Sequence, residues 1–333
     1  MRIVSRRAEA VVFGGRGDVT VSPVDLPEIG HTDVLMETRV SVVSTGTEGW
    51  ILTDRFHWGG SMPYPLVPGY QKAGVVLEVG AGVDGLAPGD RVFMTTSKVC
   101  EPVHAFSGGH ISLSQEIQSE VLKLPAEVSD LEAANLVVAQ VGYNAASRPR
   151  IHGGEVAAVF GDGMIGQMAA QALRARGARV VLCGRRQPRL ELARRYSADV
   201  VVNVAQHEAR WALSGIAPGG VQVIVDTTPS PDMSLYLDVL QPRDGQVVLS
   251  GFYPGGLDVD ADALQKREVA LLTNSGWTCE RLDATLDLVA RGLLRTTPLI
   301  THRFSYHEAP EAWSMIRDRD EDVLGVAFDW TTP

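Results

Sequence analysis

The hexapeptide GDGMIG, residues 161 to 166, has the spacing G-x-G-x-x-G, which can bind the pyrophosphate of a dinucleotide. The apolar run EVAAVF precedes it, and the helical pattern MIGQMAAQALRARG opens inside it. In such a turn the first glycine allows a tight bend, the second lets the main chain approach the phosphates, and the third lets the helix pack closely on the strand. The positive end of the helix then faces the negative ligand. We predict that the cofactor contacts this loop at Gly161, Gly163, Met164, Ile165 and Gly166.

The end of the next strand-like run, ARVVLCG, selects the kind of dinucleotide. Proteins that bind NAD usually place an Asp or Glu there to hold the ribose hydroxyls. This chain has Gly184, Arg185 and Arg186 instead. The glycine leaves room for a 2′-phosphate, and two guanidinium groups can bind it through charge-assisted hydrogen bonds. We therefore predict NADP(H) as the cofactor; surface charge alone is the alternative explanation of the two arginines.

Six short apolar runs between residues 155 and 276 predict the sheet that positions this loop. The runs are EVAAVF, ARVVLCG, DVVVNV, VQVIVDTT, GQVVLSGF and VALLTNSG, with helical or loop segments between them. Short buried strands with such crossovers predict a doubly wound parallel sheet of the α/β class. We assign Thr227 and Gly251, in the fourth and fifth runs, to the same cofactor site.

Residues 1–124 have a different pattern, with short alternating runs such as DVLMETRVSVVS and turn segments such as GAGVDGLAPGDRV. This pattern predicts a compact, mostly β domain. Farther along, Ser129 and Glu132 have the capping-box spacing that marks a helix start. We expect a nucleotide-binding domain over residues 125–276. Residues 277–333 are expected to complete the front domain, because its β-rich part is small for a self-sufficient core.

Bulk composition narrows the class of protein. The chain has 333 residues, a formal net charge of −10 and 45% hydrophobic residues. An acidic chain without a Lys/Arg block is not expected to bind nucleic acid. The three cysteines show no metal-binding or disulfide spacing. No apolar run reaches about 18 residues, so we expect no membrane segment and a cytoplasmic protein.

Taken together, these motifs resemble the medium-chain dehydrogenase/reductase superfamily over nearly the whole chain. The matching stretches are TGTE (45–48), PLVPGYQKAGVVLEVGAGVDGLAPGDRV (65–92), LPAEVSDLEAA (124–134), GDGMIG and LQPRDGQVVLSG (240–251). SVVSTGTE and YPLVPGY most resemble the branch that contains sorbitol-dehydrogenase-like proteins and bacteriochlorophyllide hydroxyethyl dehydrogenases. The resemblance implies a GroES-like β-barrel catalytic domain and a Rossmann domain, with substrate and nicotinamide meeting in the cleft. It also implies a homodimer in which the apolar edge strand VALLTNSG pairs with its twin.

The resemblance also shows what this chain lacks. Zinc-dependent members have a Cys where this chain has Thr45, a His at Tyr70, a Glu at Gln71, and a Cys or Glu at Val137. No set of thiolate, imidazole and carboxylate remains for a catalytic zinc. The resemblance therefore implies a zinc-independent member.

Tyr70 then becomes the candidate for the zinc's role. A phenol is a neutral hydrogen-bond donor at pH 7 and can stabilise charge that develops on a substrate oxygen. Thr47 aligns with the hydroxyl that relays a proton in zinc enzymes. We predict both as catalytic residues; a packing tyrosine and a turn-stabilising threonine are the alternatives. Lys72 could lower the phenol pKa, but a solvated surface lysine is the favoured interpretation.

Aromatic residues gather around this stretch, where the family covers its substrate cleft. Aromatic walls suit a flat or ring-shaped substrate, although a small satellite core is the alternative. His104 and His110 are more often structural than catalytic in such isolation, and Asp54, Arg55 and His57 fit an exposed loop as well as a polar substrate. The predicted substrate-binding residues are Thr45, Trp50, Phe56, Trp58, Tyr64 and Gln140.

Three functions fit these features. The favoured one is a zinc-independent NADPH-linked oxidoreductase that acts between a carbonyl and an alcohol of a small, cyclic substrate. A reductase of an activated C=C bond, in an enone or quinone, needs less carbonyl polarisation and stays open. A non-catalytic NADPH-binding protein is the alternative from another class, and turnover of carbonyl compounds with NADPH would exclude it.

Overall fold

The computed structural model describes residues 4–56, 62–253, 256–318 and 323–332 of the chain. They form two compact units, one made of residues 1–137 with 300–333 and the other of residues 138–299. The sequence predicts these boundaries earlier, at residues 124 and 276. The first difference has a local cause, because helix α2 (Asp130–Ala133) packs on strands β3 and β5 of the first unit. The second arises because Gln171 exchanges hydrogen bonds with the main chain of Arg295, which keeps that segment in the second unit.

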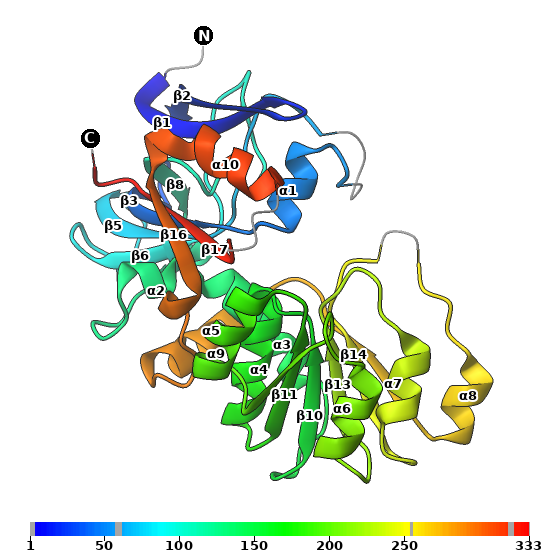
Figure 1. The fold of residues 1–333 in the computed structure, drawn as a ribbon. Helices are drawn as coiled ribbons and strands as arrows, with labels where there is room; N and C mark the ends of the chain where they lie inside the picture. The colour runs from blue at the N-terminus through cyan, green and yellow to red at the C-terminus, as the bar shows by residue number, and fades with distance from the viewer. Residues whose placement is uncertain (1–3, 57–61, 254–255, 319–322, 333) are drawn as a thin grey trace. The chain divides into compact units, whose positions relative to one another are not determined.

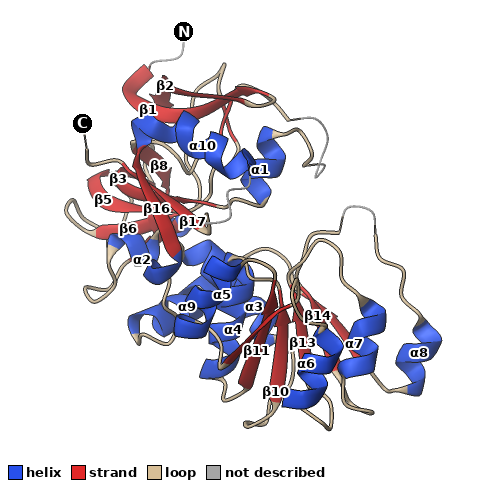
Figure 2. Ribbon diagram, in the orientation of Figure 1, coloured by secondary structure: helices blue, strands red, loops and turns tan. Residues whose placement is uncertain are grey.

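The second unit contains the predicted six-stranded parallel sheet (Figures 1 and 2). Its order is β12-β11-β10-β13-β14-β15, and every neighbouring pair is parallel. The reversal of order between β10 and β13 marks the place where such sheets bind dinucleotides. The α/β fold predicted from the six apolar runs is confirmed. The strands are β10 (Val156–Phe160), β11 (Arg179–Gly184), β12 (Val200–Asn203), β13 (Val223–Asp226), β14 (Gln246–Leu249) and β15 (Ala270–Thr273).

Helices cover this sheet and bury its apolar strands. Tyr236 and Leu213, from two of the helices, pack with Val181 and Ile224 of the sheet in one apolar cluster. On another helix, Met168, Ala169 and Ala172 are buried, as the helical pattern predicts. The helices are α3 (Leu136–Ser147, which begins just before the unit), α4 (Met164–Ala175), α5 (Gln187–Tyr196), α6 (Ala209–Ile216), α7 (Met233–Val239), α8 (Ala261–Lys266), α9 (Cys279–Ala290) and the 3-10 turn η2 (Thr297–Leu299).

The first unit is the GroES-like domain, built from two sheets. One has the order β2-β1-β4-β7 and the other β16-β17-β3-β5-β6-β9, with β8 paired to β3. The strands are β1 (Val4–Gly15), β2 (Asp18–Pro27), β3 (Asp33–Val43), β4 (Leu66–Val67), β5 (Lys72–Val79), β6 (Arg91–Met94), β7 (His104–Ala105), β8 (Leu113–Ile117), β9 (Val121–Lys123), β16 (Ile300–Ser305) and β17 (Gly325–Asp329). Because β17 pairs with β3, the end of the chain completes this unit.

Short helices close the first unit. They are α1 (Thr47–Leu52), η1 (Gln118–Glu120), α2, η3 (Tyr306–Glu308) and α10 (Ala309–Asp318). The predicted capping box is present in α2: the Ser129 hydroxyl accepts the Glu132 N–H, and the Glu132 carboxylate accepts the Ser129 N–H.

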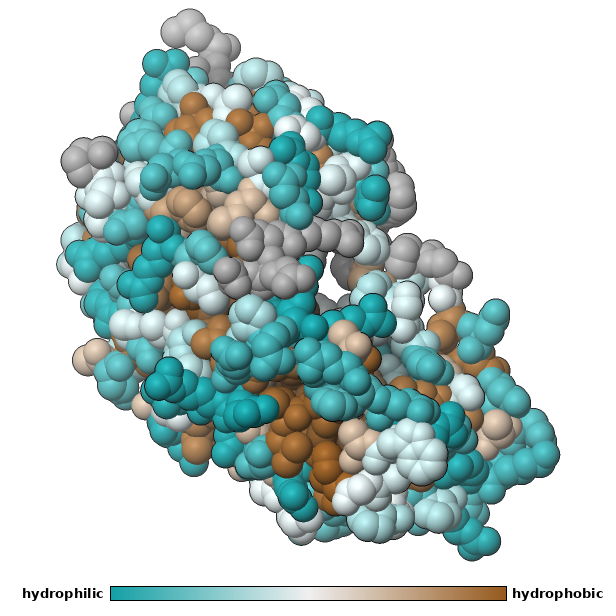
Figure 3. Space-filling model, in the orientation of Figure 1, coloured by the Kyte–Doolittle hydropathy of each residue, from teal (hydrophilic) through white to brown (hydrophobic). Residues whose placement is uncertain are grey.

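The surface in Figure 3 is mainly hydrophilic, with apolar patches between the polar residues. The large exposed apolar side chains are Leu77, Ile117, Trp211, Trp277 and Leu293. Over the described ranges, none of the helices combines the length and the apolar character needed to span a bilayer.

Candidate functional site

The glycine loop has the close approaches that its spacing predicts. A Cβ on Gly166 would lie 2.0 Å from the Gly161 carbonyl oxygen, so the helix can reach the strand only with glycine there. Gly163 is the N-cap of α4, and the space where its Cβ would point contains no other atom within 4 Å. Thr227 closes the turn from the next strand by donating its hydroxyl to the Phe160 carbonyl oxygen at 3.0 Å. The loop therefore offers open main chain at the N-terminus of a helix, which suits a phosphate.

The two arginines that predict NADP(H) directly follow β11. Arg185 is exposed, and Arg186 is half-buried at the N-cap of α5. Asp162, the second residue of the glycine loop, reaches this turn. One oxygen of its carboxylate, Oδ2, accepts the N–H groups of Arg185 at 2.7 Å and Arg186 at 2.9 Å. Sequence reasoning missed this residue, although an acidic side chain inside the glycine loop was a visible signal.

A buried carboxylate organises the ends of β13 and β14, where Thr227 and Gly251 lie. Asp226 has no solvent exposure, and it accepts hydrogen bonds from the Thr228 N–H and from the hydroxyls of Tyr236 and Tyr253. The Tyr253 oxygen in turn accepts the Gly251 N–H at 2.8 Å. Burial raises the pKa of Asp226, and these hydrogen bonds oppose the rise. This network, also missed from the sequence, holds the two strand ends in one arrangement.

In the first unit, Tyr70 is buried and its hydroxyl is hydrogen-bonded to the side chains of Ser44 and Thr47. Burial, followed by the negative charge of Glu48, raises the pKa of the Tyr70 phenol to about 12, while the two hydroxyls lower it. The two predicted catalytic residues, Tyr70 and Thr47, are therefore in direct contact. At neutral pH this phenol is an uncharged donor.

A buried histidine–glutamate pair supports the turn that carries Thr47. His110 Nε2 lies 2.8 Å from Glu48 Oε2, and both side chains are fully buried. The other Glu48 oxygen accepts the Ser44 N–H at 2.7 Å. His110 Nδ1 lies 2.8 Å from the Ser41 hydroxyl, which also accepts the Trp330 indole N–H. Sequence reasoning gave His110 a structural role and did not identify Glu48.

The expectation of a solvated Lys72 is wrong. Its side chain is fully buried, and its ammonium donates to the carbonyl oxygens of Thr96 at 2.8 Å and Gly108 at 3.0 Å. Burial lowers the pKa of Lys72 to about 7, and the negative charge of Glu116 opposes this. Both faces of β5 are covered at this point, so alternation along the strand does not bring the lysine to solvent. Lys72 is not among the groups that shift the pKa of Tyr70.

The aromatic candidates are largely fixed by other contacts. Phe56 is buried and packs edge-to-face on Phe106, with ring centroids 5.6 Å apart. Tyr64 donates its hydroxyl to the Ile51 carbonyl oxygen, and Trp50 is half-buried in α1. These contacts give Phe56 and Tyr64 a structural function in addition to any contact with substrate. Trp58 and His57 lie outside the described residues.

The remaining candidates differ in environment. Gln140, in the second unit, is fully buried, and neither end of its amide has a hydrogen-bond partner within the described ranges. Thr45 is half-buried, Asp54 and Arg55 are exposed, and His104 is exposed on β7. Gln140 is thus the candidate whose polar atoms most need a ligand or a water molecule.

Two of the positions that the resemblance aligns with zinc ligands are Gln71 and Val137. Gln71 is buried and donates its amide to the Val42 carbonyl oxygen at 3.2 Å, and Val137 is a buried apolar residue. In the described part of the chain, no three His, Cys, Asp or Glu side chains are grouped so that they could hold a metal ion.

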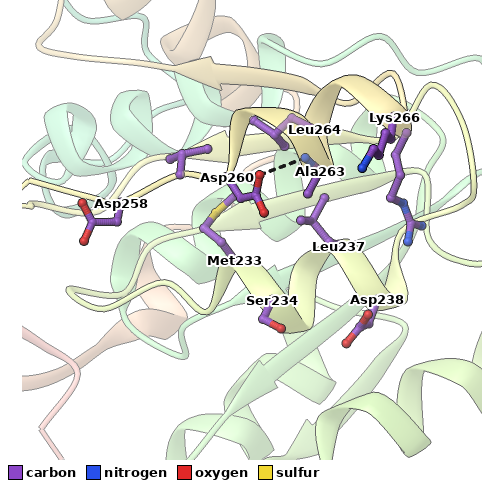
Figure 4. A pocket seen from close by; sticks show the side chains of 11 residues that line it. Met233, Ser234, Leu237, Asp238, Asp258, Asp260, Ala263, Leu264 and Lys266 are labelled. Carbon is purple, nitrogen blue, oxygen red and sulfur yellow. Dashed lines mark hydrogen bonds between the residues drawn. The ribbon is translucent and has the colours of Figure 1, made fainter.

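A hollow of about 500 Å³ lies between α7 and α8 (Figure 4), and none of the predicted site residues lines it. Met233 and Leu237 face Ala263 and Leu264 across it, and Asp260 caps α8 by accepting the Ala263 N–H. A second hollow of about 250 Å³ lies beside α10. Neither contains a residue from the glycine loop or from the Tyr70 site.

Two protein families match the sequence. The family described as zinc-binding dehydrogenase matches residues 165–291, and the alcohol dehydrogenase GroES-like domain matches residues 30–183.

Similar proteins align over most of the chain. An alcohol dehydrogenase of Geobacillus stearothermophilus is 30% identical over 66% of this chain and 70% of its own length. A Rhizobium meliloti (strain 1021) protein described as a D-xylulose reductase is 29% identical, with 95% and 97% covered. The 2-desacetyl-2-hydroxyethyl bacteriochlorophyllide A dehydrogenase of Cereibacter sphaeroides is 28% identical, with 97% and 98% covered.

Solved structures share the fold. A Sinorhizobium meliloti 1021 protein described as a zinc-binding dehydrogenase and bound to NADP superposes with a TM-score of 0.85 at 21% identity, covering 98% of this chain and 100% of that one. An alcohol dehydrogenase from E. coli CFT073 complexed with NADH has the same score at 20% identity, with 98% and 100% covered. Of these two proteins, one is bound to NADP and the other is complexed with NADH.

Proposed function

The chain belongs to the medium-chain dehydrogenase/reductase superfamily and is an oxidoreductase of the dehydrogenase type, and we propose that it is a zinc-independent, NADP(H)-dependent member. In this proposal it transfers hydride between the nicotinamide and a carbonyl or alcohol of a small, cyclic substrate. The observation that carries the proposal is Tyr70, an uncharged buried phenol hydrogen-bonded to Thr47 at a position where zinc-dependent members have a metal ligand.

Zinc does not fit the residues at those positions. Zinc takes thiolate, imidazole or carboxylate ligands. Thr45, Tyr70, Gln71 and Val137 offer a hydroxyl, a phenol with a raised pKa, an amide that is bonded to main chain, and an isopropyl group. We therefore assign carbonyl polarisation to a side chain of the protein.

Tyr70 has the properties that this assignment requires. When bound, NADPH supplies the hydride, and negative charge then develops on the substrate oxygen. A preorganised donor facing that oxygen stabilises the charge, and the loss of one such donor typically costs about 10²–10³ in kcat. Because its pKa is raised to about 12, Tyr70 keeps its proton at neutral pH yet can transfer it to an alkoxide, which is far more basic. Thr47, bonded to Tyr70, can pass a proton back to the phenol.

The chain's residues fit NADP(H). The open main chain at Gly163 suits the pyrophosphate, and Arg185 and Arg186 suit a 2′-phosphate. Thr227 and Gly251 lie at the strand ends held by Asp226, and we assign them to the nicotinamide half of the cofactor.

Reduction of an activated C=C bond is the second candidate. The donor set at Tyr70 favours it in one respect, because a single neutral phenol polarises a carbonyl less than a metal ion does. In an enone or quinone the phenol would hold the enolate oxygen.

The substrate class follows from the apolar side chains near Tyr70 in sequence and from the relatives. Trp50 and Phe56, with Thr45 as a polar contact in the same unit, suit a ring that carries one oxygen function. A bacteriochlorophyllide dehydrogenase among the relatives has a macrocyclic substrate by its name, which agrees with this class.

We also propose a homodimer. Strand β15 lies at the edge of the six-stranded sheet, and its apolar residues are half-exposed. An unpaired apolar edge favours pairing with a second copy. Light scattering at micromolar concentration should give twice the chain mass of 35.8 kDa, and a monomer would contradict the dimer.

The test is turnover of matched cyclic substrates by protein dialysed against a chelator. A cyclic ketone and the corresponding cyclic enone are incubated with NADPH, and the products are identified by mass. The proposal expects the alcohol from both substrates, with no stoichiometric zinc by elemental analysis. A saturated ketone from the enone would support the second candidate. Loss of activity on removal of zinc, with recovery when zinc is added back, would refute the proposal. If no carbonyl compound is reduced, the proposal also fails, and the chain would be a dinucleotide-binding protein without this activity.

A further inference from the structure

The carboxylate that sequence reasoning sought at the end of β11 is present, but it comes from another segment. Asp162 belongs to the glycine loop, yet its Oδ2 accepts the N–H groups of Arg185 and Arg186, the two residues that follow β11. In dinucleotide-binding sheets this strand end is where the adenosine ribose is recognised. The residue at the end of β11 is Gly184, but the carboxylate of Asp162 lies at the place where the ribose is expected.

Gly184 is required for this arrangement. A Cβ at position 184 would lie 2.6 Å from the Cβ and 2.6 Å from the Oδ2 of Asp162. Contacts that short are not tolerated, so any other residue at position 184 would displace the carboxylate. The sequence interpretation of Gly184 was room for a phosphate, whereas the structure fills that room with Asp162.

The surroundings of Asp162 are cationic. Its Oδ1 lies 3.7 Å from Arg189 Nη1, and only 12% of its side chain is exposed. Arg185 and Arg186 contact the same carboxylate through their main-chain N–H groups, and both carry a guanidinium group in this turn. The N–H groups of Arg185 and Arg186 already donate to Asp162, so a 2′-phosphate at this turn would depend on the arginine side chains.

From this geometry we propose that Asp162 is a specificity-determining residue for the cofactor. It accepts a hydrogen bond from the ribose hydroxyl of NADH and repels the 2′-phosphate of NADPH, which Arg185 and Arg186 attract. The chain then binds both cofactors, and its preference for NADPH is smaller than the two arginines alone would give. This inference rests on the proposed binding of a nicotinamide dinucleotide at the glycine loop.

The test compares Asp162→Ser with the parent in dissociation constants for NADPH and NADH, measured by titration calorimetry at one ionic strength. Serine removes the charge and keeps an oxygen that can accept a main-chain N–H. We expect NADPH to bind about fivefold to tenfold more tightly and NADH about threefold to tenfold more weakly, because repulsion and a ribose contact are lost together. Asp162→Ala should give the same directions and serves as a second variant if the serine variant is unstable.

Asp199→Ser is the matched control. Asp199 also accepts a main-chain N–H of β11, that of Val180 at 2.8 Å, and pairs with an arginine, Arg174, at 3.1 Å. It lies at the opposite end of the strand, so its replacement removes the same kind of interaction away from the ribose position. Both dissociation constants should stay within about twofold of the parent.

Weaker NADPH binding in Asp162→Ser would overturn the inference, because Asp162 would then only hold the arginine turn in place. Unchanged binding of both cofactors would overturn it too. A parent that binds NADH but not NADPH would refute the proposed cofactor preference. In that case, weaker NADH binding in the variant would still support Asp162 at the ribose. The two proposals therefore fail in different ways.

Discussion

Glu48 and Asp162 each hold a turn by accepting main-chain N–H groups, the first in one unit and the second in the other. Glu48 accepts the N–H of Ser44 in the first unit, and Asp162 accepts those of Arg185 and Arg186 in the second. Glu48 is fully buried and bonded to His110, whereas Asp162 is partly exposed among arginines. The same type of hydrogen bond, from main-chain N–H groups to a carboxylate, is therefore formed in two very different environments.

This difference in environment determines the function that each carboxylate can have. A buried charge that loses its partner is strongly destabilising, so Glu48 and His110 are tied to the stability of the Tyr70 site. Asp162 keeps 12% of its side chain exposed, so it can act on a charged ligand that binds beside it. We infer that Glu48 supports the chemistry by fixing a structure, and that Asp162 tunes binding.

The largest expected effect on stability comes from breaking the buried pair of His110 and Glu48. His110→Leu leaves Glu48 without its imidazole partner and should lower the free energy of unfolding by about 3–5 kcal/mol. Urea unfolding followed by circular dichroism measures it. Asp162→Ser should cost less, about 1–2 kcal/mol, because serine still offers an oxygen to the main-chain N–H groups.

A double variant shows whether the loss comes from the unpaired charge. Glu48→Leu combined with His110→Leu replaces both buried partners by apolar groups and should recover much of the stability. Equal losses in the single and double variants would mean that shape, rather than the unpaired carboxylate, causes the effect.

The next effect concerns cofactor binding at the turn that Asp162 holds in the second unit. Replacing Arg185 and Arg186 by alanine should raise the NADPH dissociation constant at least about tenfold and barely change that of NADH, because only NADPH has a phosphate for them to bind. Arg194 and Arg195, two exposed arginines of α5, provide the control pair. Tight and equal binding of both cofactors by the parent would contradict the NADPH preference.

The two regions also differ in how far the sequence predicts them. The six strands of the parallel sheet and the close approaches of the glycine loop follow from local patterns of apolar residues and glycines. Contacts between residues that are distant in the sequence cannot be predicted from such local patterns. His110 and Glu48 are 62 residues apart, and Asp162 and Arg185 are 23 apart, so only the folded chain brings them together.

The environment of the Lys72 side chain is likewise not predicted by the local sequence. Its polar type indicates a surface position, but the covering of both faces of β5 buries it, and two carbonyl oxygens satisfy its ammonium. Local propensity cannot report what packs on a strand from elsewhere in the chain.

The smallest expected effect is a pH dependence caused by Lys72. The pKa of Lys72 is about 7 in the folded chain and near the ordinary lysine value of 10.5 in the unfolded chain, so between these values the unfolded state binds more protons. Stability should therefore rise with pH across this window, by about 2 kcal/mol between pH 7 and 9. Lys72→Met should lose this rise in thermal unfolding, and Lys123→Met, at an exposed lysine, should keep it.

The most direct measurement is the single-turnover rate of carbonyl reduction by Tyr70→Phe, with saturating NADPH and a chelator present. Phenylalanine keeps the ring and removes only the donor. The account predicts a rate about 10²–10³ lower than that of the parent, or roughly 2.7 to 4 kcal/mol, with NADPH affinity almost unchanged. A rate close to that of the parent would contradict the account, because Tyr70 would then pack beside the substrate without polarising it.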